Sequence, residues 1–128
     1  MYADTDAMGV VYHANYIKWF EIGRAELFRE AGVTPARLAA AQLYLPVSET
    51  YCHYYASARY DQIVVLETQL VYLRKVSMKF SSVVRERSDG RLLAAGYTVH
   101  GCTDHDGRIT RIPAEIAADL RVLLADGN

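Results

Sequence analysis

Residues 15–31 read NYIKWFEIGRAELFREA, and this segment determines which architectures are open to the chain. Apolar side chains recur in it at spacings of three or four residues, which predicts a helix over the segment. Asn15 is expected to cap the helix at its amino end, and Gly32 to supply the left-handed residue that follows it. Trp19, Ile22 and Phe28 spread apolar groups well beyond one face, so we expect other elements to surround most of this helix.

Downstream of Pro46 the hydrophobic period changes from helical to two residues. This alternation predicts strands over residues 49–55, 63–73, 76–87 and 92–102, with turns at Asp89-Gly90 and Asp106-Gly107. Short helical pieces are predicted over residues 36–42 and 116–124. Because tight turns join only antiparallel neighbours, the sequence predicts an α+β fold in which a curved antiparallel sheet wraps around the early helix.

Composition narrows the possible classes of protein. A chain of 128 residues, 52% of them hydrophobic, is expected to form one domain over residues 1–128. Its 14 Lys and Arg against 15 Asp and Glu argue against a nucleic-acid-binding protein. No apolar run approaches the length of a membrane span, and the amino end has acids where a leader would need cations. Cys52 and Cys102 match no metal-site spacing, so we predict a cytoplasmic protein with no metal and no cofactor.

The segment DTDAMGVVYHANY, residues 4–16, holds the candidate chemistry. A phosphatase of the Asp-x-Asp type would need an apolar strand before the first acid, and only three residues precede Asp4 here. A calcium loop would need an oxygen ligand where Met8 stands and a bidentate carboxylate where Asn15 stands. The calcium loop fails on the residues present, and the phosphatase is disfavoured.

A third interpretation is hydrolysis of a thioester. Asp6 precedes the predicted helix by a loop's length, and the free N–H groups of a helix amino end suit a developing oxyanion. A thiol leaving group has a pKa of about 8.5, so its departure needs little acid assistance. The structural alternative is that Asp4 and Asp6 are turn or capping residues and His13 a satisfied polar group at the helix entrance. The residues alone leave these two interpretations open.

Residues 2–16, YADTDAMGVVYHANY, followed by Trp19-Phe20-Glu21 and Arg24, closely resemble the signature of the hotdog-fold acyl-CoA thioesterases. Within them the chain resembles the 4-hydroxybenzoyl-CoA thioesterase family and its Tol-Pal-associated acyl-CoA thioesterase branch. The resemblance continues through Ala58-Arg59-Tyr60-Asp61 and the long strands. It implies a long central helix wrapped by an antiparallel sheet, and homodimers or homotetramers with active sites at the subunit interface. Members of the family begin with several more residues that form a strand, so we expect that strand to be a stub here.

The resemblance also implies roles for individual residues. It makes Asp6 the nucleophile or the general base, and it places the carbonyl-polarising backbone N–H at His13, whose side chain is a second candidate. Gly9 and Tyr12 in the same loop, together with Arg59, are expected to contact the substrate. For Arg59 the alternative is an ordinary charge at the start of a strand.

The substrate implied by the resemblance is an acyl-CoA with a short-to-medium or aromatic acyl group, or the matching carrier-protein thioester. Coenzyme A carries several negative charges, whereas the chain is nearly neutral, so a local cluster of cations is needed. Arg74 and Lys75, followed by Ser77, lie at the bend between two predicted strands, and the resemblance implies that this bend binds the nucleotide phosphates. Ordinary solubility of a hairpin is the alternative for these cations. The alternative function is a non-hydrolytic acyl-binding or dehydratase-like hotdog protein.

Overall fold

A computed structural model of the chain describes residues 2–4, 13–56 and 63–124. The elements follow the predicted order, and the ends of the long strands lie within two residues of their predicted positions. The α+β hotdog fold is therefore confirmed. The elements are β1 (Tyr2–Asp4), α1 (His13–Glu30), α2 (Pro35–Ala40), β2 (Val47–Tyr54), β3 (Ile63–Leu73), β4 (Ser77–Glu86), β5 (Leu92–Gly101) and α3 (Ala114–Arg121).

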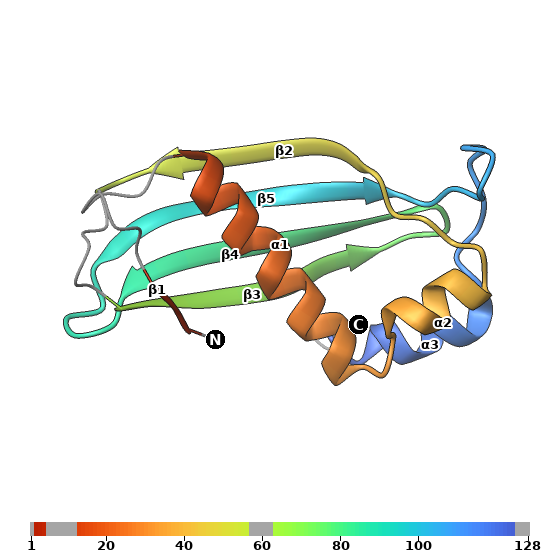
Figure 1. Cartoon of the computed structure of the whole chain (residues 1–128), viewed down its shortest axis with the longest axis horizontal. Helices are drawn as coiled ribbons and strands as arrows, with labels where there is room; N and C mark the ends of the chain where they lie inside the picture. Colours follow the sequence, from red (N-terminus) through yellow and green to blue (C-terminus); the bar gives the residue numbers. More distant parts are fainter. Residues whose placement is uncertain (1, 5–12, 57–62, 125–128) are drawn as a thin grey trace.

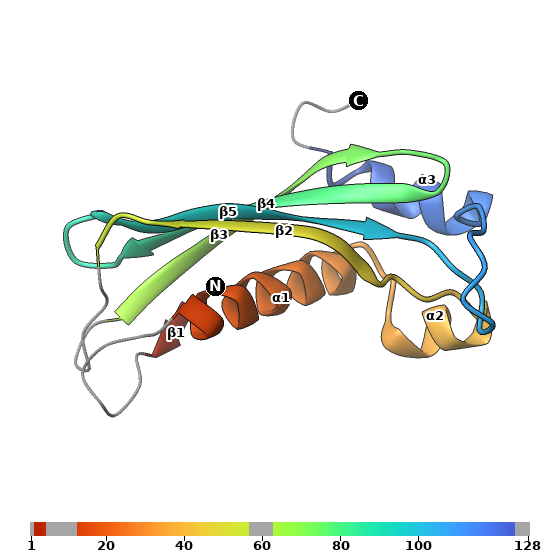
Figure 2. The ribbon, with the colours of Figure 1, turned by 90° about the horizontal axis from the view of Figure 1, so that it is seen from above.

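The five strands form one antiparallel sheet in the order β1-β3-β4-β5-β2 (Figure 1). Tight hairpins join β3 to β4 and β4 to β5, and the second of them uses Gly90 at a φ of 72°. The predicted turn at Asp89-Gly90 is thus confirmed. Among the described strands β2 pairs with β5 alone, which leaves β2 as an edge of the sheet. The helix α1 lies across one face of the curved sheet (Figure 2).

The carboxyl end of α1 agrees with the prediction, and the amino end does not. The helix begins at His13, so Asn15 lies in its first turn and the predicted N-cap is wrong. An N-cap stabilises a helix by only about 1 kcal/mol. The helix therefore extends upstream of a possible cap when the preceding residues can adopt helical backbone, as His13 and Ala14 do here. At the other end Gly32 has the predicted left-handed conformation, with a φ of 78°. The N–H of Val33 donates to the Phe28 carbonyl at 2.9 Å, which completes a Schellman motif.

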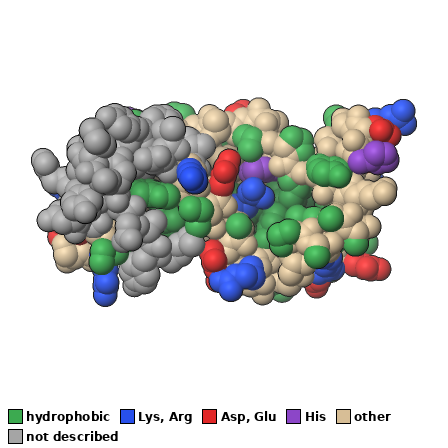
Figure 3. Space-filling view, viewed as in Figure 1, with side chains coloured by type: hydrophobic (Ala, Val, Ile, Leu, Met, Phe, Trp, Pro, Cys, Tyr) green, Lys and Arg blue, Asp and Glu red, His purple; other side chains and the backbone are tan. Residues whose placement is uncertain are grey.

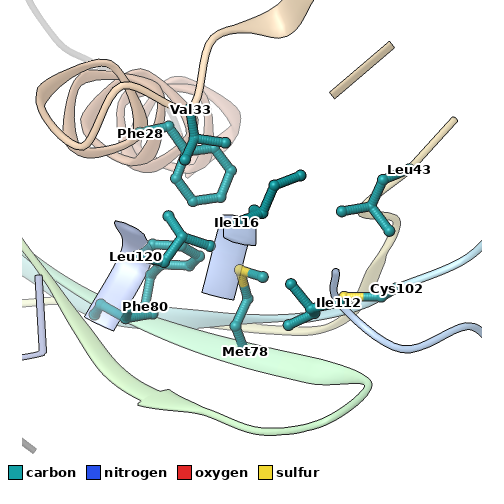
Figure 4. Close-up of a cluster of buried hydrophobic side chains, with 10 residues drawn as sticks. Phe28, Val33, Leu43, Met78, Phe80, Cys102, Ile112, Ile116 and Leu120 are labelled. Atoms are coloured by element: carbon teal, nitrogen blue, oxygen red, sulfur yellow. The ribbon is translucent and has the colours of Figure 1, made fainter. Parts of the chain in front are cut away.

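The core consists of two hydrophobic clusters, one under each half of α1. Trp19 and Phe20 pack on Val64, Leu66 and Val84 in the first cluster. The second cluster joins the end of α1 to β3, β4 and α3 (Figure 4), and its members include Phe28, Leu70, Met78, Phe80, Ile116 and Leu120. The rings of Phe28 and Phe80 meet edge to face, with centroids 5.6 Å apart. The buried residues of β3 and β4 occupy alternate positions, which agrees with the predicted period of two.

Between the two clusters α1 makes a close contact with the sheet at Gly23. A Cβ atom at this position would lie 2.1 Å from Thr68 Oγ1, a separation that no side chain permits. Thr68 Oγ1 in turn lies 3.2 Å from Ser82 Oγ, so a polar pair on β3 and β4 sits directly beneath the helix. This contact fixes how closely α1 approaches the sheet.

Candidate active site

The amino end of α1 lies at His13, where the family resemblance predicts the oxyanion donor. The first four N–H groups of any α-helix have no partner within the helix, and the helix dipole makes this end positive. Trp19 and Phe20 are 7% and 3% exposed and hold the first half of α1 on the sheet. A carbonyl oxygen next to this helix end would therefore meet donors on a rigid element.

Several of the predicted site residues lie outside the described residues. These are Asp6, Gly9, Tyr12 and Arg59. For His13 the structure describes the backbone as the first residue of α1 and not the side chain. The catalytic roles of Asp6 and His13 therefore stay predictions.

Arg74 and Lys75 form the turn between β3 and β4, as predicted. The N–H of Arg74 donates to the Ser77 carbonyl at 2.8 Å, which closes the turn. The Arg74 guanidinium lies 3.9 Å from the centre of the Tyr72 ring, a cation–π contact that positions it. The Lys75 carbonyl accepts the N–H of Ile112 at 2.9 Å, and this bond holds the segment before α3 against the turn.

These contacts leave a cavity of about 550 Å³ between the turn and α3, and four of the side chains that line it are cationic. They are Arg74, Lys75, Arg111 and Arg121, and Leu73, Ile112, Pro113, Ala114 and Ala117 complete the lining. Among the described residues no Asp or Glu lines this cavity. Its size is typical of small-molecule sites, and its charge suits a ligand with several negative groups.

The cavity contains two cations that were not predicted and lacks one residue that was. Arg111 and Arg121 were not predicted, because they come from segments that reach the turn only through the tertiary fold. Ser77 follows the turn but does not line the cavity. The sequence offered no signal for Arg111 or Arg121 beyond their charge.

The histidines of the described region show no metal-site geometry. His100 is buried at 1% exposure, and its Nδ1 lies 3.0 Å from the Leu45 carbonyl, which can only accept. The ring is therefore the Nδ1–H tautomer, and its Nε2 accepts from Thr98 Oγ1 at 3.0 Å. Within the described ranges no group of three His, Cys, Asp or Glu residues comes together to hold a metal ion. None of the helices described is long and apolar enough to cross a membrane.

The pKa of His100 is lowered mainly by burial, and the nearby Arg24 lowers it further, whereas the hydrogen bond to Leu45 and the charge of Glu21 act in the opposite direction. The unfolded chain therefore takes up the proton first, near pH 6.5. Stability contributed by neutral His100 is full above that pH and is lost as the pH falls through it towards the lower folded pKa. We expect the free energy of unfolding, measured in urea from pH 8 to pH 5, to fall more steeply in the wild type than in His100→Gln. The exposed His105→Gln control should retain the wild-type slope, and equal slopes in all three proteins would contradict this prediction.

Comparison with known proteins gives consistent matches over most of the chain. Residues 2–120 match the family model described as the Thioesterase-like superfamily. The acyl-CoA thioester hydrolase YbgC of Escherichia coli is 32% identical over 121 residues, which are 94% of this chain and 90% of the relative. The crystal structure of the hypothetical protein TT1821 from Thermus thermophilus is 33% identical, with a TM-score of 0.86 over 96% of this chain and 97% of that one. A 4-hydroxybenzoyl CoA thioesterase variant complexed with 4-hydroxybenzoyl CoA shares the fold at 19% identity, with a TM-score of 0.82 over 94% of this chain and 96% of that one.

Proposed function

This chain belongs to the Thioesterase-like superfamily, and from that premise we propose that it hydrolyses an acyl-CoA thioester to the free acid and coenzyme A. The family predicted from residues 2–16 is confirmed, and with it the general class of thioester hydrolase. The acyl group, the carrier of the thioester and the catalytic residues stay predictions, as does the cytoplasmic location.

The observation that carries the proposal is the cavity with four cations beside the β3–β4 turn. The net charge of the chain is -1, so an excess of cations over the whole surface does not account for four cationic side chains around one cavity. Among the described residues no acid lines the cavity to balance them. The nucleotide end of coenzyme A bears phosphate groups, for which guanidinium groups are suited ligands. The positive amino end of α3, at Ala114, lines the same cavity and adds to its attraction for anions.

The proposed reaction uses Asp6 and the amino end of α1. As general base, Asp6 takes a proton from water while the water oxygen attacks the thioester carbon. As nucleophile, Asp6 attacks that carbon itself, and water then cleaves the resulting anhydride. In either case the carbon–sulfur bond breaks, coenzyme A leaves as the thiolate, and backbone N–H groups at the helix end stabilise the oxyanion.

A panel of substrates tests the proposal. The protein is mixed with acetyl-, hexanoyl-, benzoyl- and palmitoyl-CoA, and thiol release is followed with a chromogenic thiol reagent. The protein's own thiols should react little with the reagent, because burial raises the pKa of Cys102 to about 11 and also raises the pKa of Cys52. Rapid release from at least one substrate supports the hydrolase. Binding of an acyl-CoA without thiol release would instead favour the acyl-binding module.

The exposed edge of β2 supports the homodimer that the family resemblance implies. Seven of its eight residues are exposed, and the strand carries no proline or lysine to prevent pairing with another edge. In the described part of the fold no strand lies along its free side. We infer that two copies pair along β2, either as the final homodimer or as half of a homotetramer, with the active sites at their interface.

A charge on the inner face of β2 tests this pairing. Thr50 lies opposite the buried Thr98, so Thr50→Lys places an inward cation at the edge, a device that blocks edge pairing. We expect this variant to sediment as a monomer at concentrations where the wild type is dimeric. Thr50→Ser, which keeps a small uncharged hydroxyl at the same position, should stay dimeric. A dimeric Thr50→Lys protein would contradict the interface.

A further inference from the structure

The cavity beside the β3–β4 turn has an apolar half that phosphate groups do not explain. Its apolar lining residues are Leu73, Ile112, Pro113, Ala114 and Ala117. Ala114 and Ala117 share one face of α3 with Arg121, because these positions are three and four residues apart. The two alanine side chains are small, so they leave space beside the cations. Figure 2 shows α3 next to the β3–β4 turn. The cavity therefore offers a ligand apolar contact as well as charge.

Arg74 presents a flat group to this cavity. Its Cζ atom lies over the Tyr72 ring, 3.9 Å from the ring centre, and the side chain lines the cavity. Tyr72 is half-buried and is not part of the lining, so it can affect a ligand there only through Arg74. A guanidinium plane is one of the groups on which proteins stack nucleic-acid bases. With one face against the Tyr72 ring, the guanidinium has its other face for a ligand.

The charges around the cavity differ from those on the α1 side of the molecule. On that side basic and acidic side chains lie next to one another (Figure 3). Around the cavity no acid among the described lining residues neutralises the four cations. Asp119, on α3 itself, pairs with Arg37 at 2.6 Å and does not line the cavity. Phosphate groups could therefore be bound directly beside the apolar half.

We propose that this cavity binds the adenine base of coenzyme A together with its phosphates, with the base stacked on Arg74 and packed against the apolar half. The inference rests on the proposed hydrolysis of an acyl-CoA. It makes Tyr72 a positioning residue, which holds the guanidinium plane towards the cavity. A carrier-protein thioester has the phosphopantetheine arm but no base, so it would leave the apolar half of the cavity empty. The lining thus favours coenzyme A over a carrier protein as the carrier of the thioester.

The test compares two ligands that have the same phosphates. Adenosine 3′,5′-bisphosphate has the base, and ribose 3,5-bisphosphate lacks it. By isothermal titration calorimetry the wild type should bind the adenosine compound roughly tenfold more tightly, or better. Arg74→Lys keeps the charge but loses the flat face, so this preference should fall to about threefold or less. Tyr72→Leu should have the same effect, whereas Tyr72→Phe should retain the preference.

Tyr44→Leu is the matched control, because Tyr44 is exposed and does not line the cavity. It should bind both ligands as the wild type does. With acyl-CoA as the substrate, Tyr72→Leu should raise KM roughly fivefold and leave kcat unchanged. A variant that merely damaged the fold would lower kcat as well, and Tyr72→Phe would not be expected to restore it.

Equal binding of the two ligands by the wild type would overturn the inference, and so would a preference that Arg74→Lys leaves unchanged. Arg74→Lys retains the test if Tyr72→Leu fails to fold. The calorimetry does not depend on turnover, so a preference for the base without thiol release contradicts the proposed function alone. Thiol release without a preference for the base contradicts this inference alone.

Discussion

Asp6→Asn is expected to lower kcat for the best acyl-CoA substrate by two to four orders of magnitude, while the protein keeps its fold. The amide has nearly the shape of the carboxylate, but it can neither accept the proton of water nor attack a thioester. General-base catalysis by one positioned side chain typically contributes about 10²–10⁴-fold, and loss of a nucleophile costs at least as much. The measurement is steady-state thiol release, with circular dichroism and thermal melting to verify the fold.

Asp4→Asn is the matched control, since it removes an equal charge two residues away. It should retain kcat within a few-fold if Asp4 has only a local structural role. His13→Ala should cost less than Asp6→Asn, because the backbone N–H that we assign to the oxyanion remains. Wild-type turnover by Asp6→Asn would refute the mechanism. Equal losses of kcat in Asp4→Asn and Asp6→Asn would show that either substitution disturbs the loop. They would contradict a specific catalytic role for Asp6.

The double variant Arg111→Gln and Arg121→Gln is expected to raise KM for acyl-CoA about 10–100-fold with little change in kcat. Both side chains line the cavity at the β3–β4 turn, far along the chain from the proposed catalytic loop. Arg111 and Arg121 are exposed, so each lost hydrogen bond is expected to cost about 0.5–1.5 kcal/mol, and the two losses together account for roughly 10–100-fold. Such a loss affects ground state and transition state alike when the group lies away from the reacting carbon. The effect should shrink as ionic strength rises, because salt screens partly exposed charges.

Two controls separate phosphate binding from a general change in charge. The first is acyl-pantetheine, which has the thioester and lacks the nucleotide, so its KM should be the same for the wild type and the double variant. The second is Arg91→Gln, which removes a cation from the β4–β5 hairpin at the opposite end of β4. It should leave KM for acyl-CoA unchanged. An increase in KM for acyl-pantetheine as large as that for acyl-CoA would place the nucleotide elsewhere.

Local patterns predicted most of the fold. The alternation of residues 76–87 predicts a strand with one apolar face. Met78, Phe80 and Val84 lie on that face and are buried, because strand periodicity depends only on neighbours along the chain. Gly32 was equally predictable, since its left-handed conformation is a local requirement of the helix end. The start of α1 was not predicted correctly, because a possible cap at Asn15 competes with small helix propensities at His13 and Ala14.

The candidate site was predictable only in part. Arg74 and Lys75 are adjacent in sequence and mark the bend by themselves, whereas Arg111 and Arg121 join them through the hydrogen bond from Ile112 to Lys75 and the packing of α3. Contacts between distant segments leave no pattern in one sequence. Asp6 was predicted from the family signature, and its role stays a prediction.

The close contact of Gly23 with Thr68 makes the middle of α1 a pivot point for the helix. The two hydrophobic clusters grip α1 on opposite sides of this point, so a bulkier side chain in one cluster would tilt the helix instead of lifting it as a whole. Tilting swings the amides at the helix start while the middle of the helix stays in place. Substitutions that repack either end of the core are therefore expected to change the direction of those amides without rebuilding the sheet beneath.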